Sequence, residues 1–169
     1  MTDKTNDWTE EFWYRGKVTR RRAVAYESLD DVLMDAERLV AAPNVKMLGN
    51  WSLGQMLAHL AGGMHMSIDG SEHRPPWFIR LLGPLFKRRV LRKMSPGFQL
   101  PKPVADKIIP IGPVTPEEGF RLLQEAIKRF RSDTSRKPHN VFGKMTGAEW
   151  HQLHLRHAEL HMSFATTEN

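Results

Sequence analysis

Four of the chain's eight histidines lie in one short stretch, WHQLHLRHAELHMSF, residues 150–164. Spacings of three and four residues bring side chains onto the same face of a helix, so His154, His157 and His161 share a narrow sector. His151 lies well round the side. Apolar residues of the stretch flank the shared sector, which predicts three imidazoles on the stripe that should face the protein interior.

Imidazoles in this arrangement can hold a metal ion. Two histidines four residues apart on one helix can bind the same ion, and a shared ion offsets the cost of burying unpaired imidazoles, about 1–3 kcal/mol each. For a single histidine on an apolar face, a hydrogen bond to a backbone carbonyl or a buried water is the usual account, and this alternative stays open. A metalloprotease is not indicated, because Glu159 of HAELH is placed on the outward half of the helix.

A tight site needs a ligand from another element. The stretch LAHLAGG offers His59, followed by Gly62 and Gly63, which allow a neighbouring backbone or a ligand to approach closely. His59 lies off the main leucine stripe of its helix, so it faces inward only if that helix is contacted on two sides. A partly exposed polar residue is the alternative. Weaker candidates, in another sector or in loops, are His65, His73 and His139.

Four amphipathic helices are needed to position these residues, and the sequence indicates where each of them begins. Each apolar stripe is preceded by a serine or threonine and has an acidic residue or a glutamine in its first turn, a pattern typical of capped helix N-termini. The predicted helices cover residues 28–42, 52–68, 115–130 and 146–164. Their apolar faces can form one helical bundle.

Prolines shape the rest of the chain. Pro84 lies within the apolar and basic residues 75–94, which predicts one kinked helix or two short ones. Residues 95–113 contain too many prolines for a regular element, so we expect a long irregular loop packed across the body. No alternating strand pattern persists. The predicted fold class is all-α, with a polar and basic arm at residues 1–22 and a single domain at residues 23–165.

Composition excludes several classes of site. With 169 residues the chain can bury one core, and the absence of cysteine excludes disulfides, thiolate nucleophiles and sulfur-ligated metals. No apolar run is long enough to span a bilayer. The polar, acidic start lacks the apolar stretch of a secretory signal, so we expect a cytoplasmic protein.

The formal net charge of +6 raises the question of acidic partners. The charge lies mainly in two clusters, at residues 15–22 and 87–93, and neither falls in a nucleic-acid-binding motif or alternates with aromatic residues. A solvated basic face is therefore favoured. Binding of nucleic acid or an acidic membrane surface, aided by the amphipathic residues 77–93, is the least favoured alternative.

The stretches NWSLGQMLAHLA and LHLRHAELHMSF together resemble the DinB-like superfamily and, within it, domain of unknown function family 1569. The resemblance covers nearly everything after about Arg20. It implies a four-helix bundle with a long crossover connection, and a metal site made from one histidine of the second helix and an HxxxH pair of the last. In this chain the corresponding residues are His59, His157 and His161.

The resemblance also implies a function. It points to a divalent transition metal, zinc first and nickel, iron or manganese as alternatives, and three neutral imidazoles leave positions open, as in catalytic zinc sites. The expected activity is metal-dependent chemistry on a small molecule, of hydrolase or thiol S-transferase type. Many such transferases have arginine and a small residue after the second histidine of the pair. Here Met162 and Ser163 follow His161, so a thiol is one substrate class among others.

Further residues could orient the ligands or line a substrate pocket. The main candidates are His154, Gln55 and Trp150, and Asp69 or Glu72 could reach the same pocket from the end of the second helix. None of them is identified as a general acid or base. A non-catalytic scaffold or ligand-binding module, with histidines satisfied internally, is the alternative function. A homodimer is also an open alternative, since helical bundles often pair.

Overall fold

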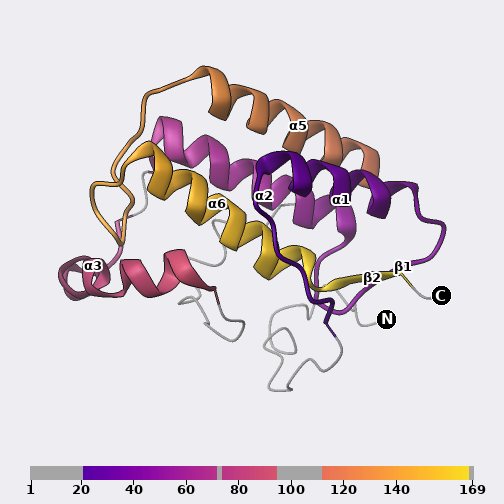
Figure 1. Cartoon of the computed structure of the whole chain (residues 1–169), viewed down its shortest axis with the longest axis horizontal. Coiled ribbons are helices and arrows are strands. Elements are labelled where there is room, and N and C mark those ends of the chain that lie inside the picture. Colours follow the sequence, from indigo (N-terminus) through magenta and orange to yellow (C-terminus); the bar gives the residue numbers. More distant parts are fainter. Residues whose placement is uncertain (1–20, 72–73, 95–111, 168–169) are drawn as a thin grey trace, which may run out of the picture.

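The structure, a computed structural model, describes residues 21–71, 74–94 and 112–167. Over these residues the protein is mostly α-helical, with five helices and one short two-stranded sheet. The helices are α1 (Leu29–Ala41), α2 (Leu53–Asp69), α3 (Trp77–Arg92), α5 (Pro116–Ser132) and α6 (Gly147–Met162), and the strands are β1 (Val45–Met47) and β2 (Ala165–Thr167) (Figure 1). Most of the predicted N-terminal arm and proline-rich loop lie outside the described residues.

The four predicted helix starts are confirmed, together with the hydrogen bonds that fix them. Ser28, Ser52 and Thr146 each accept a hydrogen bond from the amide three residues on, and the side chain at that position bonds the capping residue's own amide in return. At α5, Thr115 accepts from the Glu118 amide and a proline takes the first helical position. Each such cap contributes about 1 kcal/mol to helix stability.

Helices α1, α2, α5 and α6 share one hydrophobic core. In Figure 1, α2 runs between α5 and α6, and its packing against α5 is the most extensive between any two elements. A helix contacted on both sides can bury residues off its main apolar stripe, which is the condition that His59 required. The largest side chains that are fully buried include Leu29, Leu39, Met56, Leu57, Met64, Leu123, Ile127 and Met162.

The first turns of α2 and α5 touch through their backbones. A Cβ atom on Gly119 would lie 2.4 Å from the carbonyl oxygen of Gly54, and one on Gly54 would lie 2.2 Å from the carbonyl oxygen of Val114. No side chain larger than hydrogen fits between these backbones. The two glycines therefore set the position of α2, the helix that carries His59.

A short antiparallel sheet, absent from the sequence prediction, joins the segment that follows α1 to the segment that follows α6. Strands β1 and β2 pair in the register Val45 with Thr167, Lys46 with Thr166 and Met47 with Ala165. Three residues per strand are too few for an alternating pattern to stand out, and the partners lie more than a hundred residues apart, so the lack of a persistent alternating pattern did not exclude this sheet. The sheet begins just after α6 and holds the end of that helix in place.

The N-terminal segment covers the side of α6 that faces away from α2. The Arg22 amide donates to the carbonyl of Ser163, the Tyr26 amide donates to the carboxylate of Glu159, and Arg156 donates to the carbonyl of Tyr26. The prediction that Glu159 lies on an outward face was therefore wrong, since its side chain is only 16% exposed. Helix α6 is covered on two sides.

Helix α3 lies at the edge of the molecule, at the lower left of Figure 1. It is one helix with Pro84 inside it, so of the two predicted forms the pair of short helices is excluded. Its buried contact with the body is at Gly83, where a Cβ atom would lie 2.2 Å from the carbonyl oxygen of Val141. None of the helices in the described ranges has the length and apolar character needed to cross a membrane.

Candidate metal centre

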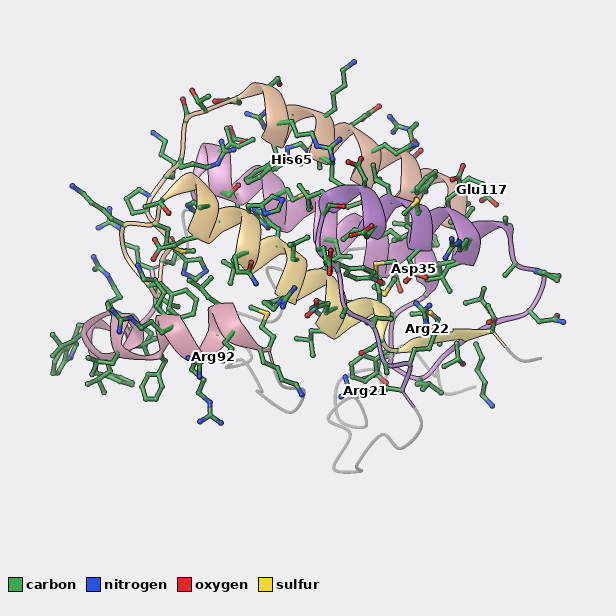
Figure 2. All side chains as sticks on the ribbon, in the orientation of Figure 1. Arg21, Arg22, Asp35, His65, Arg92 and Glu117 are labelled. Carbon is green, nitrogen blue, oxygen red and sulfur yellow. The ribbon has the colours of Figure 1, made fainter. Side chains whose placement is uncertain are left out.

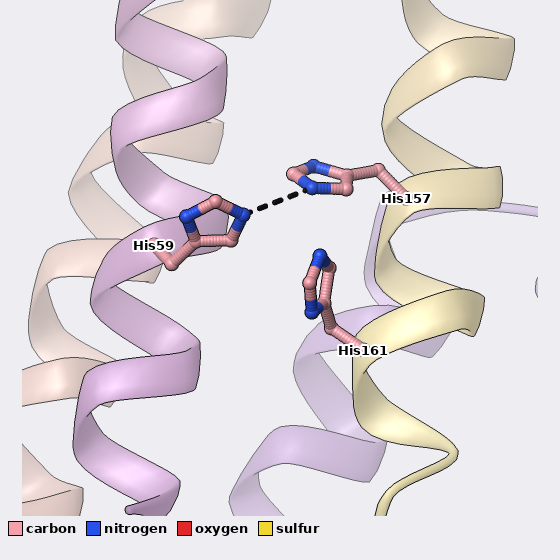
Figure 3. A group of neighbouring side chains, drawn as sticks. All are labelled: His59, His157 and His161. Carbon is pink, nitrogen blue, oxygen red and sulfur yellow. Dashed lines mark hydrogen bonds between the residues drawn. The ribbon is translucent and has the colours of Figure 1, made fainter. Parts of the chain in front are cut away.

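Three histidines from two helices meet in the interior (Figure 3). His59 of α2 and His157 of α6 approach to 3.1 Å between their Nε2 atoms. With His161, one turn further along α6, the three side chains each offer one ring nitrogen, and these nitrogens lie within 4.8 Å of one another. A tetrahedral ion bound at 2.0–2.1 Å separates two nitrogen ligands by about 3.3–3.4 Å. The three nitrogens are thus already near the spacing that a shared ion requires.

The three rings meet edge to face around a common space. Their centroids are 4.9 Å apart for His59 and His157, 4.7 Å for His59 and His161, and 4.6 Å for His157 and His161, with interplanar angles of 66–82°. In an edge-to-face pair one ring turns its edge toward its neighbour, and Figure 3 shows ring nitrogens of His59 and His157 directed at each other and a nitrogen of His161 directed toward the space between them. This orientation suits coordination of one ion by all three.

The environment keeps His157 and His161 neutral. His59 is buried at 8% exposure, and the other two are partly buried. Burial, with repulsion from the neighbouring imidazoles, lowers the pKa of His161 to about 3 and that of His157 well below its ordinary value. A neutral imidazole has the lone pair that a metal ion needs. His157 and His161 therefore require no deprotonation at pH 7 before they can bind a cation.

Trp51 contacts two of the three histidines, although no pattern in the sequence marked it as part of the site. Its indole stacks on His161, with centroids 5.3 Å apart and an interplanar angle of 15°, and it lies 4.6 Å from the ring of His59 at 52°. The sequence pattern marks this tryptophan as the residue before the cap of α2, where it would pack against Met56. Contact with two of the three histidines restricts their ring orientations, a role usual for groups around metal ligands.

The two glycines after His59 behave differently. A Cβ atom on Gly63 would lie 3.4 Å from the His157 ring, so this glycine leaves room for a side chain of α6, where the approach of a backbone or a ligand was predicted. A Cβ atom on Gly62 would meet nothing within 4 Å. Of the two glycines, only Gly63 contacts a residue of the site.

His154 and Trp150 belong to an aromatic cluster on α6, one to two turns before His157. The three histidines His59, His157 and His161 are called the triad below. The two rings stack at 5.6 Å, and His154 meets Phe130 edge to face at 4.9 Å. Both side chains are buried, and neither His154 Nε2 nor Trp150 Nε1 has a hydrogen-bond partner in the described part of the chain. Burial, with the nearby charge of Arg136, lowers the pKa of His154 to about 3. His154 is thus held neutral beside the triad.

Several weaker candidates have other partners. His139 stacks on Phe142 and accepts hydrogen bonds from the amides of Val141 and Phe142, and burial lowers its pKa to about 4. Asp69 forms an exposed ion pair with Arg129, which also contacts His65. These contacts organise a turn and a helix surface, away from the triad.

Gln55 has two structural contacts. Its Oε1 accepts from the Ser52 amide to complete the cap of α2, and its Nε2 donates to the carbonyl of Gly112 at 3.0 Å. His151 is partly buried at the side of α6, and two of the proposed residues, Glu72 and His73, lie outside the described residues.

Comparison with known proteins places the chain in a family. The model of a family described as Protein of unknown function (DUF1569) matches residues 18–168. The chain belongs to this family. No curated protein and no solved structure matches it. The DUF1569 match includes both α2 and α6, so all three histidines lie within the family's domain, but its description carries no reaction. The activity has to be argued from the site.

Proposed function

We propose that this DUF1569 protein binds one divalent transition metal, with zinc as the first candidate, through His59, His157 and His161. We further propose that it is an enzyme that uses this metal to act on a small molecule. The observation that carries the proposal is the convergence of three ring nitrogens, within 4.8 Å of one another, from two helices packed in one core. A single buried histidine is ordinarily satisfied by a hydrogen bond, whereas three with nitrogens this close are typical of a metal site.

The fold we propose for this site is the DinB-like four-helix bundle. In it α1, α2, α5 and α6 are the bundle helices, and the chain from α3 to α5 is the long crossover. The shared core of the four helices and the peripheral position of α3 support this assignment. We also propose that residues 23–165 form a single domain, with residues 1–22 as an arm.

Three histidine ligands favour a catalytic site over a structural one. They leave at least one coordination position for substrate, and because all three are neutral, the charge of the ion is not compensated by the protein. When bound, such an ion acts as a Lewis acid that lowers the pKa of water or of a thiol and polarises a carbonyl group. An uncompensated positive charge favours substrates with a thiolate or carboxylate group. Hydrolysis and thiol S-transfer remain the two reaction classes proposed.

A second function is favoured by one specific contact. The 3.1 Å approach of His59 Nε2 to His157 Nε2 is also a hydrogen bond, if one ring carries its proton on that atom. In that case the two imidazoles satisfy each other, and the protein is a helical scaffold or ligand-binding module without catalysis. Metal content separates the two proposals.

The test is metal analysis of purified protein and variants. We expect about one zinc per chain in wild type, and loss of the metal in His59→Gln and in His157→Gln because each removes one of three ligands. His151→Gln, a control on the same helix, should keep the metal. Zinc added at 100 times its Kd should stabilise wild type by about 2.7 kcal/mol, and the ligand variants should show no such gain.

Two outcomes would contradict the proposal. Equal metal content in wild type and in all three variants would place the ion elsewhere, and absence of both metal and zinc-dependent stabilisation would favour the scaffold. If metal is bound, the protein should be screened with ester and amide substrates and with electrophiles plus low-molecular-weight thiols. Any turnover should disappear in His157→Gln and persist in His151→Gln.

A further inference from the structure

Helix α3 exposes an unusual amount of apolar surface. Six of its large side chains are about half exposed or more, and Trp77 and Leu85 reach 75% and 76%. Together they present on the order of several hundred Å² of apolar surface, comparable to the largest patch on a typical soluble monomer. The six residues, called the α3 face below, are Trp77, Phe78, Leu81, Leu82, Leu85 and Phe86.

The α3 face is exposed because the helix is attached to the body by its other side. At 100° per residue the six side chains occupy one half of the helix, and Ile79, Gly83 and Val90 occupy the other half. Gly83 is the buried contact point, and Lys87, on the same half, forms an ion pair of 2.6 Å with Glu149 of α6. The attachment therefore fixes the α3 face outward.

The charges on α3 are all of one sign. The helix has no acidic residue, and all of its basic residues except Arg80 lie toward the C-terminal end, after the α3 face. Figure 2 shows Arg92 projecting away from the other helices. The described basic residues on and just after α3 that are exposed are Arg80, Arg88, Arg89, Arg92 and Lys93.

This combination decides between occupants of the α3 face. Aromatic and leucine side chains beside several arginines, with no acidic residue, are typical of helices that lie in the interface of an anionic membrane. A second copy of the chain would offer no acidic residue on its own α3 to pair with these arginines, which disfavours self-association through this face. Acidic lipid headgroups instead complement the basic end, while the apolar end enters the boundary between headgroups and acyl chains.

We propose that α3 is a peripheral membrane-docking helix for anionic lipid. Trp77 to Phe86 enter the interfacial layer, and Arg88, Arg89 and Arg92 contact lipid phosphates. The helix lies in the surface of the bilayer and does not cross it. The proposal is independent of the metal site, because no residue of the α3 face belongs to the triad.

The experiment is sedimentation of the purified chain with vesicles of phosphatidylcholine, with or without about one-third phosphatidylserine. Wild type should bind the anionic vesicles and bind the neutral ones far more weakly. Leu81→Gln combined with Leu85→Gln should reduce binding at least about tenfold, since it removes apolar area that would leave water. Arg88→Gln combined with Arg92→Gln should reduce it about fivefold per charge.

Matched controls are available on other helices. Met34→Gln changes an exposed apolar side chain of α1, and Lys128→Gln removes an exposed charge of α5, and neither should alter vesicle binding. Lipids brominated along their acyl chains should quench fluorescence of bound wild type, and Trp77→Phe should remove most of that quenching while binding persists. Circular dichroism would verify that each variant is folded.

Three results would overturn the proposal. The first is failure of wild type to bind anionic vesicles, which would mean that protein covers the α3 face. The second is equal binding by wild type and by both double variants. The third is a wild-type protein that forms a dimer in solution, where Leu81→Gln combined with Leu85→Gln gives a monomer and neither protein binds vesicles. That result would make the α3 face a self-association surface.

Discussion

The backbone contact between α2 and α5 predicts opposite effects for two glycine-to-alanine substitutions. In Gly119→Ala the new methyl carbon would lie 2.4 Å from the carbonyl oxygen of Gly54. Unstrained carbon–oxygen contacts are about 3.3 Å or longer, so the helices must separate by about 0.9 Å. In Gly62→Ala the methyl group would meet nothing within 4 Å. Both positions lie inside helices, so alanine has the same advantage in helix propensity at each.

The expected free energies follow from these distances. Overpacking of a well-packed contact costs about 1–3 kcal/mol, and the upper half applies here because the obstructing atom is backbone and cannot rotate away. Alanine recovers up to about 1 kcal/mol of helix propensity, which leaves Gly119→Ala about 1–2 kcal/mol less stable than wild type. Gly62→Ala lacks the steric cost and should gain up to about 1 kcal/mol. For a chain of this length, 1 kcal/mol shifts Tm by about 2–4 °C.

The assay is thermal and urea unfolding of wild type and both variants, followed by circular dichroism without added metal. We expect Tm to fall by about 2–8 °C in Gly119→Ala and to rise by up to about 4 °C in Gly62→Ala. If Gly119→Ala were as stable as Gly62→Ala, the first turns of α2 and α5 would not touch as described. The position of His59 relative to α6 would then lose its support.

Two further predictions concern buried polar groups. Tyr26 donates its hydroxyl to Asp35, which also pairs with Arg22, so Tyr26→Phe should cost about 1.5–3 kcal/mol in urea unfolding, and an unchanged midpoint would argue against that bond. Burial lowers the pKa of His139 to about 4 and that of His154 to about 3, so below pH 6.5 the unfolded chain takes up protons that the folded chain excludes. The free energy of unfolding of the metal-free protein should therefore fall as the pH is lowered from 6.5 to 4, by about 2 kcal/mol per histidine at pH 5. The fall should be less steep in His139→Gln, and an equal free energy of unfolding at pH 7 and pH 5 would contradict the prediction.

The helix starts could be predicted because their causes are local. Ser28, Ser52, Thr115 and Thr146 bond amides within their own first turns, so each signal is complete in a few residues. The spacing of three and four along α6 is equally local, and it put His157 and His161 on one face. His59 could be offered from the sequence as a ligand from a second helix, but no local pattern relates residues 98 positions apart, and the family resemblance was needed to group it with the pair.

Features that depend on where helices meet were not predictable from this one sequence. Gly54 and Gly119 have no special backbone requirement of their own, and their importance comes only from the crossing of α2 and α5. The stacking of Trp51 on His161 likewise arises from tertiary packing. The sequence of α3 showed an apolar and basic helix, and only the structure shows which half of it is attached to the body.

The separation between His59 and the α6 pair has a kinetic consequence. Residues 98 positions apart come together only after a long loop closes, a step that is entropically costly and slow compared with helix formation. The unfolded chain, or a state with formed but undocked helices, brings together at most His157 and His161 of the three proposed ligands. In the proposed metal site, tight binding by all three imidazoles therefore begins only when α2 docks against α6. The rate at which metal affinity develops during refolding would thus report the assembly of the core, separately from the appearance of helix.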